Sequence, residues 1–299
     1  MSERMHVFDR GLVRRRRRRF ARDLAGHDFL LREIAERLVD RLHDISRPLP
    51  RVLCLGGPAG LIEPMLAQRF GIERLVLADP EPALLAGSTA PAVALDEEAL
   101  PFAPASFNAV LGLATLHWVN DLPGALLQLS TCLAPDGLLL LAIPGGETLG
   151  ELRQALTEAE LACEGGASPR VSPFLDVRDA GGLLQRAGLA LPVVDLDRIT
   201  VSYGEPLRLL RELGGMGQSN ALLRRRHGPL RRATVATACT LYRERFGDAE
   251  GRVPATFDIL FLTAWKPHAS QPRPLPRGSG KVSLAEHLAV PARDPADEG

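Results

Sequence analysis

The stretch RVLCLGGPAG, residues 51–60, decides the fold class of this chain. Its first five residues have the apolar pattern of a short buried strand, and glycines and a proline then break the strand into a turn. The helical segment LIEPMLAQRF (61–70) and a second strand, RLVLADP (74–80), follow directly. The order strand, turn, helix, strand is a βαβ unit, which predicts two parallel strands.

The same alternation continues beyond this unit. We expect strands at 92–95, 108–113 and 138–143, and a helix at 122–133. Strands that alternate with helices predict a parallel sheet covered on both faces, which is a doubly wound α/β fold. Before the first strand, apolar residues recur at helical spacing over 29–42, which predicts an amphipathic helix.

The pattern loosens after Gly150 and predicts helical additions to the α/β core. We expect helices at 150–163, 176–187, 205–214 and 229–246, and a late strand at 256–265 that returns to the edge of the sheet. Residues 267–299 are rich in proline and poor in large apolar side chains, so they predict a disordered tail. The expected division is a basic segment with a helix (1–44), one α/β domain (45–266) and this tail.

The composition is that of an ordinary globular protein. Basic and acidic residues balance at 36 each, and 45% of residues are hydrophobic, so no nucleic-acid partner is expected. The four cysteines lie far apart without a C-x-x-C pair, which predicts neither a metal site nor a disulfide framework. No apolar run approaches the roughly 18 residues of a membrane span. We therefore expect a cytoplasmic protein.

An unbroken run of arginines, Arg14–Arg19, stands near the start of the chain. Such a run is too charged to enter a core and repels itself where it is unpaired. The first interpretation is a solvated helix start, and the second is an arm that makes weak contact with an anionic surface. A third, an organellar presequence, fits less well because Asp9 and Asp23 flank the run and serines are few.

The glycine turn and the next strand end predict a nucleotide-type cofactor site. Gly56, Gly57 and Gly60 allow a close approach of the backbone, and the following helix start offers free N–H groups. Asp79 ends the second strand, at the spacing of roughly 20 residues where an acid reaches ribose hydroxyls in doubly wound folds. Taken alone, Asp79 is also a common strand-end turn residue.

Further candidates follow the third and fourth strands. Asp96 is placed to accept a hydrogen bond from an adenine amino group, and Glu97 beside it joins the predicted site, although Glu97 and Glu98 are expected to face solvent more. His117 and Trp118 come at the carboxyl edge, where open sheets bind ligands. His117 is either a satisfied structural histidine or a base, and Trp118 either a core residue or a wall of the cofactor site.

Ten short motifs spread over the chain resemble one family. They are FDR (8–10), LPF, LHWVNDL, PDG, ETLGELR, EGG, SPF, LLQRAG, GMGQSN and VPAT. Together they look like the respiratory complex I assembly factor 5 family, which has mitochondrial members and bacterial counterparts. The resemblance runs from about residue 5 to residue 266, and GMGQSN (215–220) is its most specific part. It implies that this chain is a bacterial counterpart.

The resemblance implies the class I methyltransferase fold, a Rossmann-like doubly wound sheet, with S-adenosylmethionine (SAM) as cofactor. It also implies a protein partner, such as a complex I subunit, and arginine hydroxylation as in the mitochondrial member. The GMGQSN turn is then expected to expose backbone to a peptide, while the acids attract a target arginine. Two alternatives stay open: the carrier-protein O-methyltransferase of biotin synthesis, and a cofactor-free assembly chaperone. No catalytic residue is assigned.

The chain departs from the methyltransferase pattern D-x-G-x-G-x-G at two positions. Cys54 replaces the strand-end acid, and Pro58 replaces the middle glycine. Proline has no N–H to donate and cannot adopt a left-handed conformation. The sequence therefore predicts that SAM binds weakly or not at all, and that Pro58→Gly improves binding if the pocket is otherwise intact.

Overall fold

The computed structural model describes residues 6–228, 230–272, 279 and 283. Contacts between Cα atoms divide the chain into two units, Met1–His268 and Ala269–Gly299. Every helix and strand described below lies in the first unit. Most of the tail predicted at 267–299 lies outside the described residues. In the described part, no helix is both long and apolar enough to cross a membrane.

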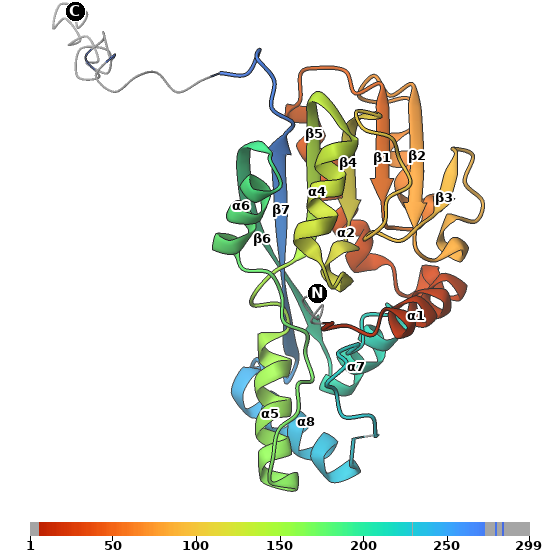
Figure 1. The fold of residues 1–299 in the computed structure, drawn as a ribbon. Coiled ribbons are helices and arrows are strands. Elements are labelled where there is room, and N and C mark those ends of the chain that lie inside the picture. Colours follow the sequence, from red (N-terminus) through yellow and green to blue (C-terminus); the bar gives the residue numbers. More distant parts are fainter. Residues whose placement is uncertain (1–5, 229, 273–278, 280–282, 284–299) are drawn as a thin grey trace, which may run out of the picture. The chain divides into compact units, whose positions relative to one another are not determined.

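The described part of the chain forms a seven-stranded sheet (Figure 1). Its strands are β1 (Arg51–Leu55), β2 (Arg74–Asp79), β3 (Ala92–Ala94), β4 (Phe107–Leu113), β5 (Leu133–Pro144), β6 (Ala190–Tyr203) and β7 (Val253–Trp265). The strand order is β3-β2-β1-β4-β5-β7-β6, in which β7 runs antiparallel to both of its neighbours. Strands β1 to β5 pair in parallel, which confirms the predicted doubly wound sheet.

The far side of the sheet differs from the prediction in one respect. The late strand does not end the sheet, because β6 pairs along nearly its whole length and forms the edge. The sequence pattern missed β6, whose polar residues alternate with apolar ones, as in ALPVVDLDRITVSY. One solvated face produces this alternation, and it contrasts with the continuous apolar runs of β4 and β5, which are buried on both faces.

Helices cover both faces of the sheet, as predicted. They are α1 (Arg10–Arg22), α2 (Phe29–Asp40), α3 (Ala59–Leu66), α4 (Leu122–Cys132), α5 (Gly150–Glu164), α6 (Val177–Arg186), α7 (Pro206–Gly215) and α8 (Arg232–Phe246), with 3-10 turns at Leu24–Gly26, Arg41–Asp44, Pro82–Leu85 and Leu116–Trp118. One hydrophobic cluster joins α2 and α3 to Val52 and Cys54, and another joins α4 and α6 to Leu53 and Leu55. Neighbouring residues of β1 thus point to opposite faces.

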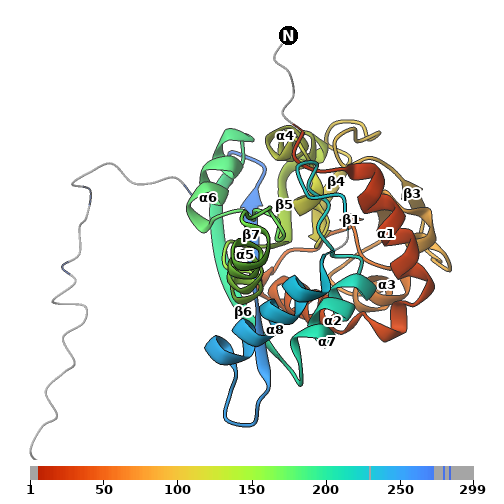
Figure 2. The same ribbon diagram turned by 90° about the horizontal axis from the view of Figure 1, so that it is seen from below.

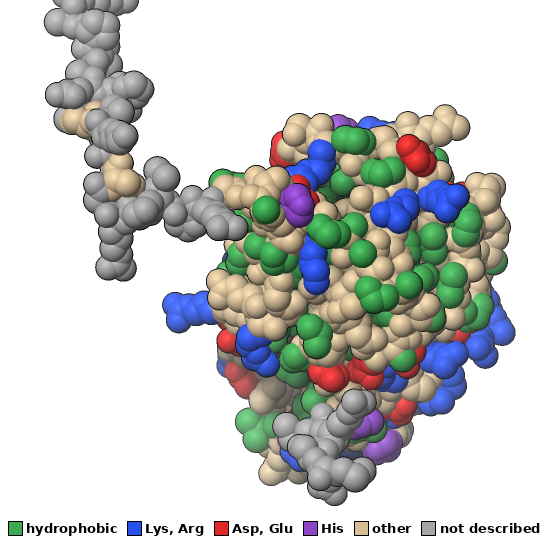
Figure 3. All heavy atoms as spheres, turned by 45° about the horizontal axis from the view of Figure 1, so that its top comes forward, with side chains coloured by type: hydrophobic (Ala, Val, Ile, Leu, Met, Phe, Trp, Pro, Cys, Tyr) green, Lys and Arg blue, Asp and Glu red, His purple; other side chains and the backbone are tan. Residues whose placement is uncertain are grey.

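The carboxyl ends of the parallel strands meet at the end of the sheet near α1 (Figure 1). Figure 2, seen from below, shows α1, α5, α7 and α8 gathered at this end. Figure 3 brings the opposite end forward, where basic, acidic and apolar side chains are interspersed. Ligands of open α/β sheets bind at the carboxyl ends of the strands, so the helices at that end bound the candidate site.

Candidate functional site

The turn between β1 and α3 depends on its first two glycines. Gly56 and Gly57 have φ angles of 76° and 82°, in the left-handed region that glycine adopts without strain. A Cβ atom on Gly56 would lie 2.6 Å from the carbonyl oxygen of Leu113, and one on Gly57 would lie 2.7 Å from the Leu113 side chain. The turn therefore packs closely against Leu113 at the end of β4, and only glycine fits at these two positions.

The two unusual residues of the turn have different consequences. Pro58 has a φ of −67° and is the N-cap residue of α3, so this position needs no left-handed conformation. Relative to glycine, proline therefore removes only a backbone N–H donor here. Cys54 is buried in β1, and burial together with Asp79 raises the pKa of its thiol to about 12. It packs as a small apolar side chain. Gly60 is exposed, with open space where a Cβ would lie.

Asp79 is fully buried and holds an arginine from α1. The Nε of Arg17 donates to one carboxylate oxygen at 3.3 Å, its Nη2 donates to the other, and the backbone N–H of Glu81 donates at 2.8 Å. Burial raises the pKa of the Asp79 carboxyl, while Arg17 and the Glu81 N–H act in the opposite direction. The acid predicted to receive ribose hydroxyls thus accepts a two-point guanidinium contact.

A second arginine of α1 is surrounded by three carboxylates. Arg10 donates to Asp96, Glu97 and Glu98, the last at 3.0 Å. Glu97 also accepts a hydrogen bond from the hydroxyl of Thr115 at 2.6 Å and is only 4% exposed. The expectation that Glu97 faces solvent is therefore wrong, because Arg10 and Thr115 compensate the cost of its burial.

The arginine run does not behave as a free arm. Val13, Arg17 and Phe20 form the buried stripe of α1, so the expectation that the run stays out of the core is wrong for Arg17. The partner charge of Asp79 makes that burial tolerable. Arg16 donates to a backbone carbonyl of the GMGQSN segment, and Arg18 contacts the Glu81 carboxylate at 3.2 Å. Arg14, Arg15 and Arg19 are exposed.

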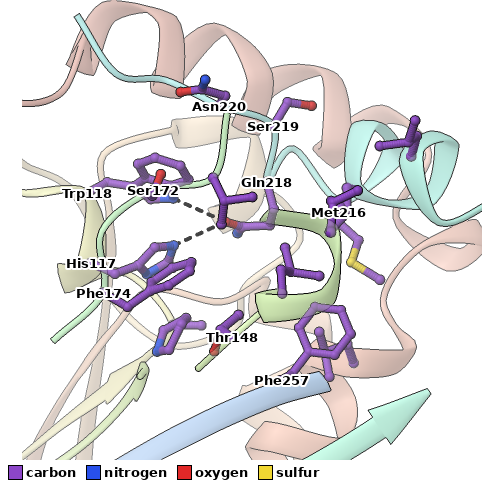
Figure 4. Close-up of a pocket in the computed structure, with 18 of the residues that line it drawn as sticks. His117, Trp118, Thr148, Ser172, Phe174, Met216, Gln218, Ser219, Asn220 and Phe257 are labelled. Atoms are coloured by element: carbon purple, nitrogen blue, oxygen red, sulfur yellow. Dashed lines mark hydrogen bonds between the residues drawn. The ribbon is translucent and has the colours of Figure 1, made fainter. Parts of the chain in front are cut away.

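His117 and Trp118 contact Gln218, a residue that the sequence alone does not place in the site. The side-chain oxygen of Gln218 accepts from the Nε1 of Trp118 at 3.2 Å and contacts the Nε2 of His117 at 3.0 Å (Figure 4). Phe8 packs edge-on against the Trp118 ring, with centroids 5.3 Å apart. Gln218 lies in the GMGQSN motif, and this motif is the one feature of the sequence that could have indicated a role for Gln218 in the site.

The centre of the GMGQSN turn is covered, so the expectation of exposed backbone is wrong at Met216 and Gly217. Met216 and Gly217 are buried, and a Cβ on Gly217 would lie 3.2 Å from the carbonyl oxygen of Arg16 in α1. The side-chain amide of Asn220 donates to the carbonyl of Pro169 at 2.7 Å. The motif thus joins α1 and the loop before α6 to the residues after β4.

The predicted site residues separate into two groups. His117 and Trp118 border a cavity of about 250 Å³, with walls from α1, α2, α5, α7 and the 170–174 loop. The other described candidates (Gly56, Gly57, Gly60, Asp79, Asp96 and Glu97) do not line this cavity. Three of them, Asp79, Asp96 and Glu97, bind the arginines of α1 instead. Among the described residues, no group of three or more His, Cys, Asp or Glu is placed to bind a metal.

Comparison with known proteins defines the class. A family model described as a methyltransferase domain matches residues 17–192, which is more than half of the chain. Among solved structures, the YcgJ protein of a Bacillus species superposes with a TM-score of 0.52 at 12% identity, over 77% of this chain and 98% of that one. The chain is therefore a protein of the methyltransferase fold.

The more similar relatives narrow this class. The arginine-hydroxylase NDUFAF5 of zebrafish (Danio rerio) mitochondria is 42% identical over 94% of this chain and 89% of its own length. The malonyl-[acyl-carrier protein] O-methyltransferase of Halorhodospira halophila is 35% identical over 79% of this chain and 81% of its own length. This chain belongs to the NDUFAF5 family, which confirms the predicted assembly factor 5 resemblance.

SAM is the cofactor of the methyltransferase class to which the chain belongs, and the residues that the sequence predicts to bind it lie toward the carboxyl ends of the strands. Gly56 and Gly57 form the close turn, Asp79 ends β2, and Asp96 follows the end of β3. Arg17, however, takes both oxygens of Asp79. Because Asp79 is 0% exposed, a ribose could reach its carboxylate only after Arg17 has moved away.

Proposed function

We propose that this chain binds an arginine side chain of a protein partner during respiratory complex I assembly in the bacterial cytoplasm, and holds it for modification. The observation that carries the proposal is the arginine recognition already made within the chain. Two guanidinium groups of α1, those of Arg10 and Arg17, occupy carboxylate-lined positions at the strand ends. The named activity of the NDUFAF5 relatives on arginine supports the same reading.

The geometry suits guanidinium rather than ammonium. The Nε and Nη2 of Arg17 meet the two oxygens of Asp79, which is the planar two-point contact that arginine makes and lysine cannot. Around Arg10, carboxylates of Asp96, Glu97 and Glu98 converge from one loop. We infer that α1 occupies the place of a partner's arginine and that this arginine binds when α1 withdraws.

The cofactor and the arginine would then meet at one edge of the sheet. When bound, SAM supplies a methyl group that is already activated for transfer. Asp79 would accept the ribose after Arg17 has left it, and Glu97 and Glu98, which now hold Arg10, would hold the guanidinium of the partner. The chain's own residues orient and desolvate these groups, since Asp79 and Glu97 are almost fully buried.

A deletion strain and its parent provide the test. Mass spectrometry of complex I subunits should find an arginine modification that is absent from the deletion strain, together with less assembled complex. The wild-type gene should restore both, and Asp79→Asn should not, because an amide cannot replace the carboxylate beside a guanidinium. Normal assembly and an unchanged arginine pattern in the deletion strain would contradict the proposal.

Carrier-protein O-methylation is the second candidate. The observation that favours it is the 35% identity to the Halorhodospira halophila enzyme over 81% of that enzyme's length. The same deletion strain separates the two functions. A biotin requirement combined with normal complex I would transfer the assignment to the carrier-protein reaction.

A further inference from the structure

A second cavity, of about 670 Å³, shares part of its wall with the cavity beside His117. The shared residues belong to the loop before α6, and the rest of the lining comes from the start of the chain, the beginning of α5 and the residues after the GMGQSN turn. Small-molecule sites in proteins commonly enclose roughly 300–1,000 Å³. The second cavity therefore has the size of a small-molecule site.

The charged side chains that line this cavity are all basic. They are Arg153 and Arg224, with His6 beside them, and none of the described lining residues is an aspartate or a glutamate. The strand ends at Asp79 and Asp96 have the opposite character. Because acidic and basic residues balance over the whole sequence, the positive charge here is a local feature. A cavity of this kind favours an anion.

Arg153 keeps hydrogen-bond donors available for a ligand. Its Nη2 donates to the backbone carbonyls of Gly146 at 3.4 Å and Thr148 at 3.3 Å, while its Nε and Nη1 meet no acceptor among the described residues. In the part of the chain that the structure describes, only two buried side-chain nitrogen or oxygen atoms lack a partner, and neither belongs to Arg153. The unpaired donors of Arg153 are therefore accessible from outside the core.

Arg224 contributes the second guanidinium. It is the first of three consecutive arginines, of which Arg225 pairs with Asp9 and Arg226 pairs with Glu164. The side chain of Arg224 is exposed and forms no ion pair with any residue that the structure describes. The cavity is thus lined by the one member of this triplet whose charge is not already compensated within the described fold.

Hydrogen bonds hold two walls of the cavity in place. The backbone N–H of Leu223 donates to the carbonyl of Val7 at 2.9 Å, which joins the start of the chain to the residues after GMGQSN. The side-chain amide of Asn220 donates to the carbonyl of Pro169 at 2.7 Å, which fixes the loop before α6. A wall that is already ordered costs little entropy when a ligand binds.

We propose that this cavity binds a small organic anion, a carboxylate carried on an apolar body, whose carboxylate is held by Arg153 and Arg224. Guanidinium groups suit a carboxylate because they offer parallel N–H donors. The apolar body would pack against Phe174 and Leu222, which line the same cavity. The site does not depend on the proposed recognition of a partner's arginine, since none of the strand-end acids lines it.

Three probes test the proposal by calorimetry on the full chain: 2-naphthoate, its neutral analogue 2-naphthamide, and inorganic phosphate. 2-Naphthoate should bind about tenfold more tightly than 2-naphthamide, which corresponds to about 1.4 kcal/mol. Raising NaCl from about 0.05 M to about 0.5 M should reduce this preference, because salt screens accessible charges. Phosphate should bind more weakly than 2-naphthoate, since it has no apolar surface to bury. Equal binding of the two naphthalene probes, or tighter binding of phosphate, would overturn the proposal.

Two variants identify the residues that hold the carboxylate. Arg153→Met and Arg224→Met should each reduce the preference for 2-naphthoate over 2-naphthamide to within about threefold, because each removes charged donors. Arg178→Met removes the same charge from an exposed arginine that does not line the cavity, and should keep the preference. Arg224 makes no described side-chain contact that the fold would lose, so its variant remains informative if Arg153→Met fails to fold. An undiminished preference in Arg224→Met would refute the assignment.

Methyl NMR of the wild-type chain locates the bound probe. Of the two cavities, Val7 and Leu222 line the basic one, whereas Leu30 and Ile34 line the one beside His117. Nuclear Overhauser effects should connect the naphthalene protons of 2-naphthoate to the methyl groups of Val7 and Leu222. Effects to Leu30 and Ile34 alone would place the anion in the other cavity and contradict the proposal.

Discussion

Replacing Arg17 by methionine removes the charge that compensates Asp79 while keeping a long, flexible side chain in α1. Asp79 is 0% exposed, and of the hydrogen bonds that its carboxylate accepts from described residues only the one from the Glu81 N–H, at 2.8 Å, would remain. Loss of one partner from a buried ion pair costs roughly 3–5 kcal/mol. We therefore expect the free energy of unfolding of Arg17→Met to fall by about that amount at pH 7.

The loss should depend on pH in a defined direction. Burial already raises the pKa of Asp79 above the value of 3.8 for an unperturbed aspartate, and the loss of Arg17 raises it further. Between pH 3.8 and the higher pKa of Asp79 in the folded variant, the folded state binds more protons than the unfolded chain. The stability of the variant therefore decreases as pH rises through the folded pKa. The deficit relative to the wild type should be largest at neutral pH and should shrink toward pH 4.

Urea unfolding and calorimetric titration with SAM measure the two consequences of this substitution. Because Asp79 becomes free to accept ribose hydroxyls, SAM should bind Arg17→Met at least about tenfold more tightly than the wild type, a difference of about 1.4 kcal/mol. Added SAM should also return part of the lost stability, since a ligand that binds only the folded state stabilises it.

Arg15→Met is the matched control, because Arg15 lies exposed on the same helix. Its unfolding free energy should stay within about 0.5 kcal/mol of the wild type, with unchanged SAM affinity. A combined Arg17→Met and Asp79→Asn variant should lose the gain in SAM binding. If Arg17→Met cost less than about 1 kcal/mol and left SAM affinity unaltered, the assignment of Arg17 as an occupant of the ribose position would be wrong.

Three other outcomes follow from the structure. Pro58→Gly should tighten SAM binding by restoring an N–H, most visibly in the absence of Arg17, and calorimetry that finds no change in either background would rule out a role for that N–H. Burial lowers the pKa of His117 from 6.5 to about 4, so between these pH values the folded state binds fewer protons than the unfolded state. The free energy of unfolding should therefore decrease by up to about 3 kcal/mol as pH falls from 6.5 to 4. Urea titrations across that range should show less of this slope in His117→Phe. Changing the exposed arginines Arg14, Arg15 and Arg19 to glutamine should weaken binding to an anionic partner at low salt, and binding that is insensitive to both salt and substitution would reduce them to a solvated face.

Several candidate residues could be placed from the sequence because their positions depend on local chain geometry. The glycine turn after β1 is an example, since Gly56 needs its left-handed φ of 76° and leaves no space for a side chain. The ends of β2 at Asp79 and of β4 at Leu113, shortly before His117, follow from apolar runs of limited length. The edge strand β6 escaped detection because its exposed face mixes charges into the pattern.

The sequence by itself determined three features: the succession of strands and helices in the parallel part of the sheet, the glycine turn, and the family. Each of them depends on contiguous residues or on short motifs. Only the tertiary structure decided what the candidate residues contact. Arg17 meets Asp79 across 62 positions of the chain, and Gln218 meets His117 across 101. A run of arginines has the same local pattern whether one member enters the core or none does. The difference depends on whether a buried carboxylate elsewhere in the fold offsets the cost of removing that charge from water, and distant pairing of this kind leaves no periodicity in the sequence.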